Sequence, residues 1–185
     1  MRVISGTARG RRLKELQGMD TRPTTDKVKE SLFNIIQFDI EGRKILDLFG
    51  GTGQLGIEAL SRGADHCTFV DQRRDAVSLI RENVKTCGFQ VKSHVVQGDA
   101  LSFLATCREK YDVILLDPPY NTELLDESIK AIVKFDILRE HGIMVCESAS
   151  ERVLPELNAP YEEGRSYRYG KIKLTVCRRA GSERE

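Results

Sequence analysis

The chain has 185 residues, a length typical of one domain with a sizeable hydrophobic core. Hydrophobic residues form 40% of it and charged residues 31%, a composition that excludes the membrane-spanning and disordered classes. The opening residues MRVISG lack the long apolar core of a signal peptide, so we expect a cytoplasmic protein. Five scattered cysteines and three histidines without ligand spacing argue against a disulfide framework or a metal site.

The net charge is only +1, but the charges are unevenly distributed along the chain. Residues 1–40 carry eight basic and five acidic side chains, residues 161–185 carry seven and four, and residues 41–160 carry fourteen and nineteen. This asymmetry is typical of basic ends that contact a polyanion, and equally of a solvated surface with random unevenness.

The first fourteen residues, MRVISGTARGRRLK, hold five basic side chains and no acidic one. Apolar residues on either side of two glycines predict a short, twisted β-hairpin here. Its basic side chains are candidate phosphate contacts, unless the segment is only a flexible, solvated tail. These candidates are Arg2, Arg9, Arg11, Arg12 and Lys14.

A helix is predicted within residues 21–37, with Thr25 or Asp26 as its N-terminal cap. Its apolar stripe consists of Val28, Leu32, Ile35 and Ile36. We expect residues 1–40 to form an N-terminal extension, residues 41–180 the main domain and residues 181–185 a tail.

From residue 44 onward the pattern alternates between strand and helix. Strands are predicted at residues 44–49, 67–71, 91–96, 112–117 and 142–147, and two alternating runs in residues 161–177 predict an antiparallel hairpin. The order indicates an α/β fold with a doubly wound, mostly parallel, seven-stranded Rossmann-like sheet that the hairpin completes.

Residues 51–56, GTGQLG, match the G-x-G-x-x-G pattern directly after the first strand. Both nicotinamide proteins and S-adenosylmethionine proteins use such a turn, so the pattern alone is a weak signal. Asp47 lies three residues before the glycines. Its carboxylate would repel a pyrophosphate and attract the ammonium group of a methionine moiety.

Three further acids are predicted at the ends of the next strands. Asp71 is placed to accept from two ribose hydroxyls and Asp99 from an adenine amino group, and Asp117 completes the row. Each acid alone also suits a loop or helix cap. Four carboxylates at four strand ends together favour a cationic nucleoside without phosphates.

Asp117, Pro118, Pro119 and Tyr120 follow an apolar run that is typical of a buried strand. The prolines end the strand because they cannot donate to a sheet ladder, and ligands bind at that edge of open α/β sheets. A planar base could donate its amino hydrogens to Asp117 and to the Pro118 carbonyl, with Tyr120 against its face. A strand-ending turn with a capping aspartate is the alternative.

Taken together, these motifs resemble class I S-adenosylmethionine-dependent methyltransferases. More closely, the chain resembles the bacterial RsmD-type enzymes, which methylate the N2 amino group of a guanine in small-subunit ribosomal RNA. The resemblance covers nearly the whole chain and rests on RVISGTARGRRL, RPTTDKVKESLFNII, LDLFGGTGQLGIEALSRGA, GDA, LDPPY and Asp71. Two departures are FGGTG, where the family more often has F-A-G-S-G, and Ser5, where a second glycine is usual.

The resemblance implies a methyltransferase sheet, S-adenosyl-L-methionine as cofactor, and small-subunit ribosomal RNA or an assembling small subunit as partner. It also implies a monomer that needs neither metal nor membrane. The cofactor residues that it implies are Asp47, Gly50, Gly51, Gly53, Asp71, Gln72, Asp99, Ala100 and Asp117. The implied catalytic residues, around the target base, are Asp117, Pro118, Pro119 and Tyr120. The RNA-binding residues are Arg2, Arg9, Arg11, Arg12, Lys14 and Arg22, with Arg22 and Thr24 near the cofactor or RNA entrance.

The residues alone, without the resemblance, leave other functions open. The same chemistry on adenine N6 or cytosine N4 of a nucleic acid, or on a protein glutamine, is the nearest alternative, although no separate domain for DNA recognition is visible. A nicotinamide dehydrogenase leaves Asp47 and residues 117–120 without a purpose. A non-catalytic RNA-binding protein on the same fold would not need these four residues intact.

Overall fold

A computed structural model describes residues 1–16 and 25–181. The expectations for Arg22 and Thr24 concern residues outside these ranges. Within them the chain forms a seven-stranded sheet of β1 (Lys44–Asp47), β2 (His66–Asp71), β3 (Ser93–Gln97), β4 (Tyr111–Leu116), β5 (Leu138–Ala149), β6 (Tyr161–Tyr169) and β7 (Ile172–Arg179).

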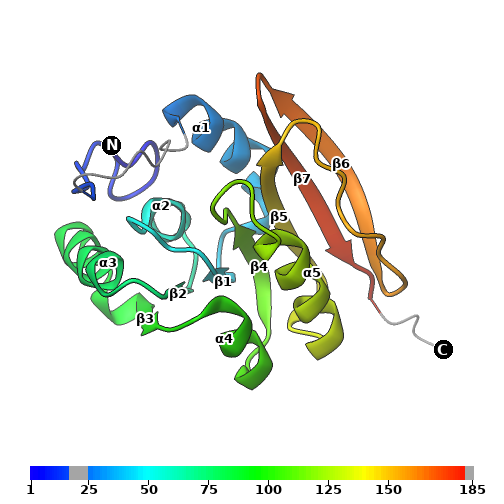
Figure 1. Ribbon diagram of the computed structural model, residues 1–185. Helices are drawn as coiled ribbons and strands as arrows, with labels where there is room; N and C mark the ends of the chain where they lie inside the picture. The colour runs from blue at the N-terminus through cyan, green and yellow to red at the C-terminus, as the bar shows by residue number, and fades with distance from the viewer. Residues whose placement is uncertain (17–24, 182–185) are drawn as a thin grey trace.

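The strands lie in the order β3-β2-β1-β4-β5-β7-β6 (Figure 1). The first five strands pair in parallel, while β7 is antiparallel to both β5 and β6. The predicted fold, a doubly wound sheet completed by an antiparallel hairpin, is therefore confirmed.

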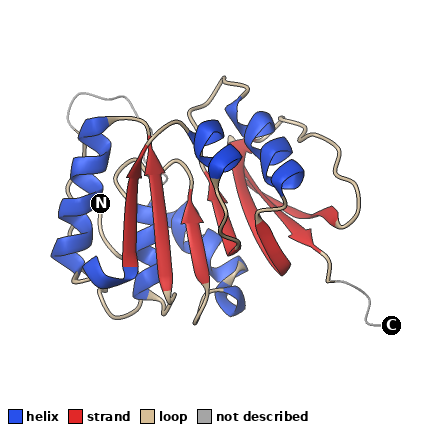
Figure 2. Ribbon diagram, turned by 90° about the horizontal axis from the view of Figure 1, so that it is seen from below, coloured by secondary structure: helices blue, strands red, loops and turns tan. Residues whose placement is uncertain are grey.

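Helices cover both faces of the sheet (Figure 2). They are α1 (Asp26–Ile35), α2 (Gln54–Ser61), α3 (Arg74–Cys87), α4 (Ala100–Thr106) and α5 (Leu124–Phe135). Alternate residues of a strand enter opposite cores: Ile45 packs with α1, α2 and α3, and Leu46 packs with α4 and α5. This burial on both sides explains the continuous apolar runs of the parallel strands. None of the described helices is long and apolar enough to cross a membrane.

Several strand boundaries differ from the prediction by one or more residues: β1, for example, ends at Asp47 rather than at residue 49. The starts of the third and fifth strands have a visible cause. The third strand begins at Ser93 rather than at residue 91, because Gln90–Lys92 form a 3-10 turn in which the Val91 side chain is 97% exposed. The fifth strand begins earlier than predicted, at Leu138, because this residue already pairs with Tyr111 of β4.

The N-terminal segment forms the expected hairpin, but its regular β-pairing is limited to one bridge between Arg2 and Arg12. Next to this bridge, the Val3 amide donates to the Arg11 carbonyl at 2.9 Å. Val3 and Leu13 are buried in the same core as α1, α2 and α3, so the hairpin is part of the packed structure.

A buried carboxylate on α2 holds this hairpin. Glu58 accepts hydrogen bonds from the amides of Ile4 at 2.8 Å and Ser5 at 2.9 Å. The Lys29 ammonium on α1 lies 3.8 Å from Glu58 Oε2 and donates to the Arg2 carbonyl at 2.7 Å. Lys29 and Glu58 are fully buried, so each charge depends on these partners.

Candidate functional site

The strand order reverses between β1 and β4, and in open α/β sheets the ligand crevice lies beyond the carboxyl ends of the strands at such a switch point. We call this edge of the sheet the crevice. Asp47 lies opposite Leu115 in the register of these two strands. Asp117 follows Leu115 by two residues, just beyond the end of β4. The topology thus brings two of the four predicted aspartates to neighbouring positions at this edge.

The loop from β1 to α2 passes over the end of β2 with a tightly constrained backbone. The Gly50 amide donates to the Val70 carbonyl at 2.9 Å, and the Gly53 amide donates to the Gly50 carbonyl at 2.7 Å. A side chain at position 50 would approach the Cδ1 atom of Ile80 to 2.7 Å. Gly53 has a left-handed φ of 81° where α2 begins, a conformation that favours glycine.

Asp71 connects this loop to the end of β2. Its Oδ2 atom accepts from the Gly51 amide at 2.9 Å, and its Oδ1 atom accepts from the Arg73 amide at 2.9 Å. Each oxygen of a carboxylate can accept two hydrogen bonds, so both retain capacity for a ligand. Gln72, which lies between Asp71 and Arg73 in the chain, is exposed.

Asp47 is the most buried of the four aspartates, with only 2% of its surface exposed. Its Oδ2 atom accepts from the Gly56 amide in the first turn of α2 at 3.0 Å. Burial raises the pKa of Asp47 to about 7; the Gly56 amide opposes this rise, and the nearby Asp71 charge adds to it. A cation at this edge would stabilise the ionised form of Asp47 and lower its pKa.

Asp99 caps α4 at the end of β3, since its Oδ1 atom accepts from the Ser102 amide at 2.8 Å. The capping alternative therefore applies to this acid. One of its two oxygens makes the cap, and Ala100 beside it is buried in the core of α4 and α5.

Residues 117–120 leave the sheet directly after β4 ends at Leu116, as the two prolines require. Asp117 is half-buried, whereas the Tyr120 side chain is exposed. The Tyr120 hydroxyl donates to Glu147 Oε1 at 2.9 Å, and the Thr122 hydroxyl donates to the Pro119 carbonyl at 2.9 Å. The aromatic ring is therefore held at the edge of the sheet while part of it faces solvent.

Sequence reasoning missed two residues of this region. Glu147 is buried near the end of β5, and its position at the end of a predicted strand could have revealed it. Asn83 on α3 donates from Nδ2 to the Thr52 carbonyl at 2.9 Å and accepts from the Lys14 amide at 2.8 Å. It links the hairpin to the glycine loop, and no local signal marks it.

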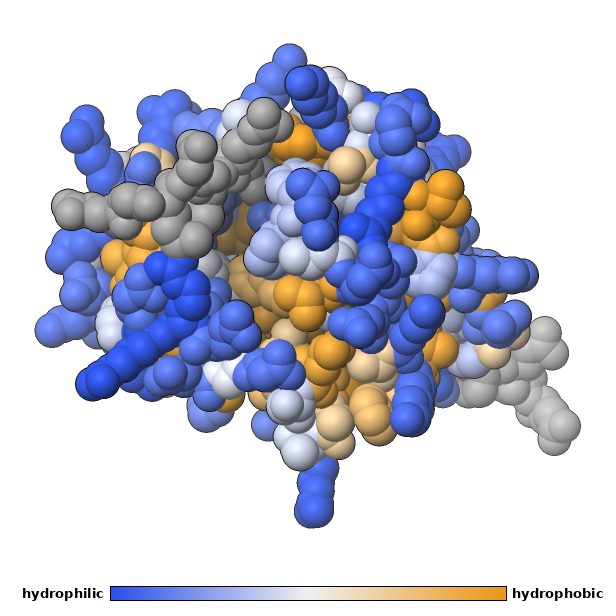
Figure 3. All heavy atoms as spheres, viewed as in Figure 1, coloured by the Kyte–Doolittle hydropathy of each residue, from blue (hydrophilic) through white to orange (hydrophobic). Residues whose placement is uncertain are grey.

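The hairpin that carries the basic side chains is bonded to α2 and α3, and Arg2 lies 3.5 Å from Asp26 of α1. Arg9, Arg11 and Arg12 are exposed, the Lys14 ammonium pairs with Glu82 at 2.7 Å, and Arg2 is exposed as well. Figure 3 shows hydrophilic residues around the hairpin and α3, with hydrophobic residues nearer the middle of this face. The five basic candidates of the hairpin are thus exposed, while Arg22 lies outside the described residues.

Among the described residues, no three His, Cys, Asp or Glu side chains are grouped so that they could hold a metal ion. The acids at the strand ends are engaged with backbone amides instead. Their chemistry suits a ligand that donates hydrogen bonds or carries positive charge.

Comparison with known proteins adds the family. The model of a family described as "Conserved hypothetical protein 95" matches residues 1–178. The chain is 41% identical over 184 residues to the YlbH protein of Bacillus subtilis (strain 168), covering 98% of this chain and 100% of that one. It is 33% identical over 179 residues to "Ribosomal RNA small subunit methyltransferase D" of Escherichia coli (strain K12), covering 97% and 90%. The solved structure of yhhF from Escherichia coli matches with a TM-score of 0.87 at 32% identity, covering 97% and 98%.

Proposed function

The chain belongs to the ribosomal RNA small subunit methyltransferase D family and is a methyltransferase, and we propose a mechanism and a substrate for its active site. The methyl group of S-adenosyl-L-methionine is transferred to the N2 amino group of a guanine in small-subunit ribosomal RNA, either free or in an assembling subunit. One observation supports this assignment most strongly: Asp117 and Tyr120 follow β4 at the switch point, beside Asp47 and the glycine loop.

The carboxylate acceptors of the crevice fit this cofactor, which when bound supplies a methyl group on a positively charged sulfur. Asp47 would hold the α-ammonium group, Asp71 the ribose hydroxyls and Asp99 the adenine amino group. The spare acceptor capacity of Asp71 and the burial of Asp47 support these roles. The remaining cofactor contacts in the proposal are Gly50, Gly51, Gly53, Gln72, Ala100 and Asp117.

Residues 117–120 would position the target amino group. Asp117 and the Pro118 carbonyl accept its two hydrogens, which favours a pyramidal nitrogen with a lone pair free for attack. The bond from the nitrogen to the methyl carbon would form as the carbon–sulfur bond of the cofactor breaks, and S-adenosylhomocysteine would leave with the electron pair. The methylated nitrogen is then a cation and acidic, so it would release its proton to solvent without a strong base. Most of the catalytic effect comes from proximity and from these two acceptors.

The target guanine must be unpaired or flipped out to reach this edge. The Tyr120 ring would stack on its face, and the buried Glu147 carboxylate would hold the ring through the tyrosine hydroxyl. The exposed basic residues of the extension, residues 1–40, would contact RNA phosphates outside the crevice.

The class of substrate can be tested with methyl-labelled S-adenosyl-L-methionine. The protein is incubated in parallel with protein-free small-subunit RNA, assembled small subunits, duplex DNA and ribosomal proteins. We expect label in the RNA of one or both of the first two samples. Label confined to DNA or to protein would overturn the proposal.

A further inference from the structure

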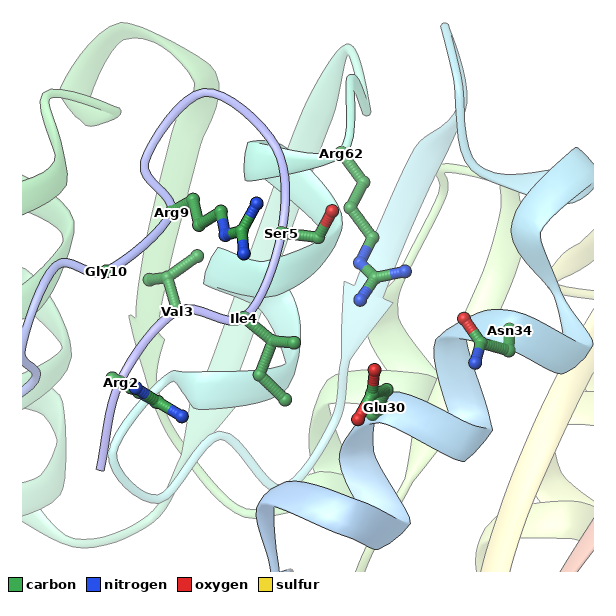
Figure 4. Close-up of a pocket in the computed structure, with 9 residues that line it drawn as sticks. All are labelled: Arg2, Val3, Ile4, Ser5, Arg9, Gly10, Glu30, Asn34 and Arg62. Carbon is green, nitrogen blue, oxygen red and sulfur yellow. The ribbon is translucent and has the colours of Figure 1, made fainter.

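A cavity of about 430 Å³ lies between the N-terminal hairpin and α1 (Figure 4). The hairpin contributes Arg2, Ser5 and Arg9 to its lining, α1 contributes Glu30 and Asn34, and Arg62 follows the end of α2. The glycine loop precedes the opposite end of α2, a helix about 12 Å long. The cavity is therefore separate from the crevice between β1 and β4.

The charges that line this cavity favour an anion. Three arginines face one carboxylate, that of Glu30, and Arg2 is partly engaged by Asp26, with 3.5 Å between Nε and Oδ2. Figure 4 shows the guanidinium groups of Arg9 and Arg62 on either side of Ser5. Two such groups with a hydroxyl between them match the oxygens of a phosphate group.

Arg62 is held in place before any ligand arrives. Its Nε atom donates to Glu58 Oε1 at 2.9 Å, and its Cζ atom lies 5.0 Å from the centre of the Phe33 ring. Glu58 is also the partner of the buried Lys29, so these three side chains together retain one positive charge. The remaining amino groups of Arg62 extend toward the cavity (Figure 4).

The hairpin wall of the cavity is fixed as well. The Thr7 amide donates to the Ser61 carbonyl at 2.8 Å, and the Ala8 amide donates to the Ser61 hydroxyl at 2.9 Å. A side chain at Gly6 would come within 1.7 Å of the Ser61 carbonyl oxygen, so only glycine permits this close approach. A site with fixed walls loses little conformational entropy when a ligand binds.

We propose that this cavity binds a phosphodiester group of the RNA strand between Arg9 and Arg62, with the adjoining nucleotide against Ser5 and Asn34. The proposal rests on the proposed function only for the identity of the strand, because binding here requires neither cofactor nor methyl transfer. The contact would lie beyond α2 from the target base and would orient the RNA rather than react with it.

The first test measures the affinity for a fluorescent single-stranded RNA oligonucleotide by anisotropy at several salt concentrations, without cofactor. Arg9→Gln should lower the slope of log K against log salt by about 0.7, the value for one lost phosphate contact on a single strand. Arg9→Lys should keep most of the slope. Arg108→Gln is the matched control, since Arg108 is exposed beyond α4 on the opposite face of the sheet. Equal slopes for Arg9→Gln and Arg108→Gln would overturn the proposal.

A second pair of variants tests the sign of the charge effect. Glu30→Gln removes the carboxylate from the cavity and should tighten RNA binding. Glu162→Gln makes the same change in net charge on β6, the far edge of the sheet, and should have a smaller effect. Equal effects of the two would show that only net charge matters and would contradict the proposal.

Binding of inorganic phosphate is measured to distinguish a phosphodiester group of RNA from a free phosphate ion as the ligand of the cavity. If phosphate binding depends on Arg9 while the RNA affinity and its salt slope do not, the cavity takes a free anion and the proposal is wrong. A protein that binds RNA in this way but transfers no methyl group would leave the inference intact and refute the proposed function alone.

Discussion

The four aspartates at the strand ends lie in different surroundings, which determine what each can do. Asp71 is bonded on both oxygens to backbone amides, Asp99 caps a helix, and Asp47 is almost fully buried. Asp117 is half-buried beside two prolines. One residue type therefore supplies a hydrogen-bond acceptor, a cap and a group with a raised pKa at one edge of the sheet.

Replacement of Asp71 tests the cofactor site. Asp71→Ala should weaken S-adenosyl-L-methionine binding by about 1–3 kcal/mol, the cost of leaving hydroxyl donors without a charged acceptor. Isothermal titration calorimetry measures this change. Asp75→Ala, at an exposed acid in the first turn of α3, is the control and should bind normally. Unchanged affinity in Asp71→Ala would remove Asp71 from the site.

The raised pKa of Asp47 predicts that cofactor affinity depends on pH. An ionised Asp47 is needed to pair with the ammonium group, and its pKa in the free protein is about 7. The Kd should therefore decrease as the pH rises toward about 7 and level off above it. Asp47→Asn should bind more weakly and lose this dependence. A wild-type Kd that is flat between about pH 5.5 and about pH 8 would contradict the assignment.

Replacement of Asp117 tests the proposed reaction directly. Asn keeps one acceptor oxygen, so Asp117→Asn should retain part of the activity, whereas Asp117→Ala should lose on the order of 10²–10³ in rate. Single-turnover methyl transfer is the measurement, with circular dichroism as the folding control. The fold should survive both changes, since the buried residues of β4 are untouched. Near-normal turnover by folded Asp117→Ala would refute its catalytic role.

At the scale of elements, the hairpin is joined to α2 through Glu58 and Ser61. These contacts pair residues 53 or 54 positions apart in the chain. The composition of the first fourteen residues predicted a basic hairpin, but nothing in it revealed the buried acid that holds the hairpin. Lys29 and Glu58 lie on two separate helices, and only the fold brings them together.

The contribution of Glu58 to the free energy of unfolding can be measured. Glu58→Ala should destabilise the protein by about 3–5 kcal/mol, because it leaves the Lys29 charge buried without its partner. Urea unfolding gives the change, and Glu162→Ala at an exposed position of β6 should change stability by less than about 0.5 kcal/mol. A loss below about 1 kcal/mol in Glu58→Ala would show that Lys29 finds another partner or water.

The strands illustrate the limits of local patterns. Buried runs such as Val113–Leu116 predicted the parallel strands, because burial on both faces requires continuous apolar residues. Val91 was wrongly included in the third strand, since an apolar β-branched residue favours a strand whether or not a neighbour pairs with it. The bond between Tyr120 and Glu147 depends on the pairing of β4 with β5, which the sequence of neither strand encodes.

At the scale of the whole molecule, two candidate surfaces lie at opposite ends of α2. The crevice lies at the switch point between β1 and β4, while Arg2, Arg9 and Arg62 line a separate cavity beyond α2. In our account, the first surface brings the methyl group and the base together and the second orients the RNA. The alternation of strands and helices predicted the crevice, whereas the cavity emerged only from the packing of the hairpin on α1 and α2.

The most direct test of this account identifies the methylated atom. Small-subunit RNA, free and in assembled subunits, is incubated with methyl-labelled S-adenosyl-L-methionine and the protein, then digested to nucleosides and separated by chromatography with mass detection. Asp117→Ala provides the background. The account predicts that the label appears as N2-methylguanosine and falls to near background with Asp117→Ala. Label in N6-methyladenosine or N4-methylcytidine, or no label in either form of the RNA, would contradict it.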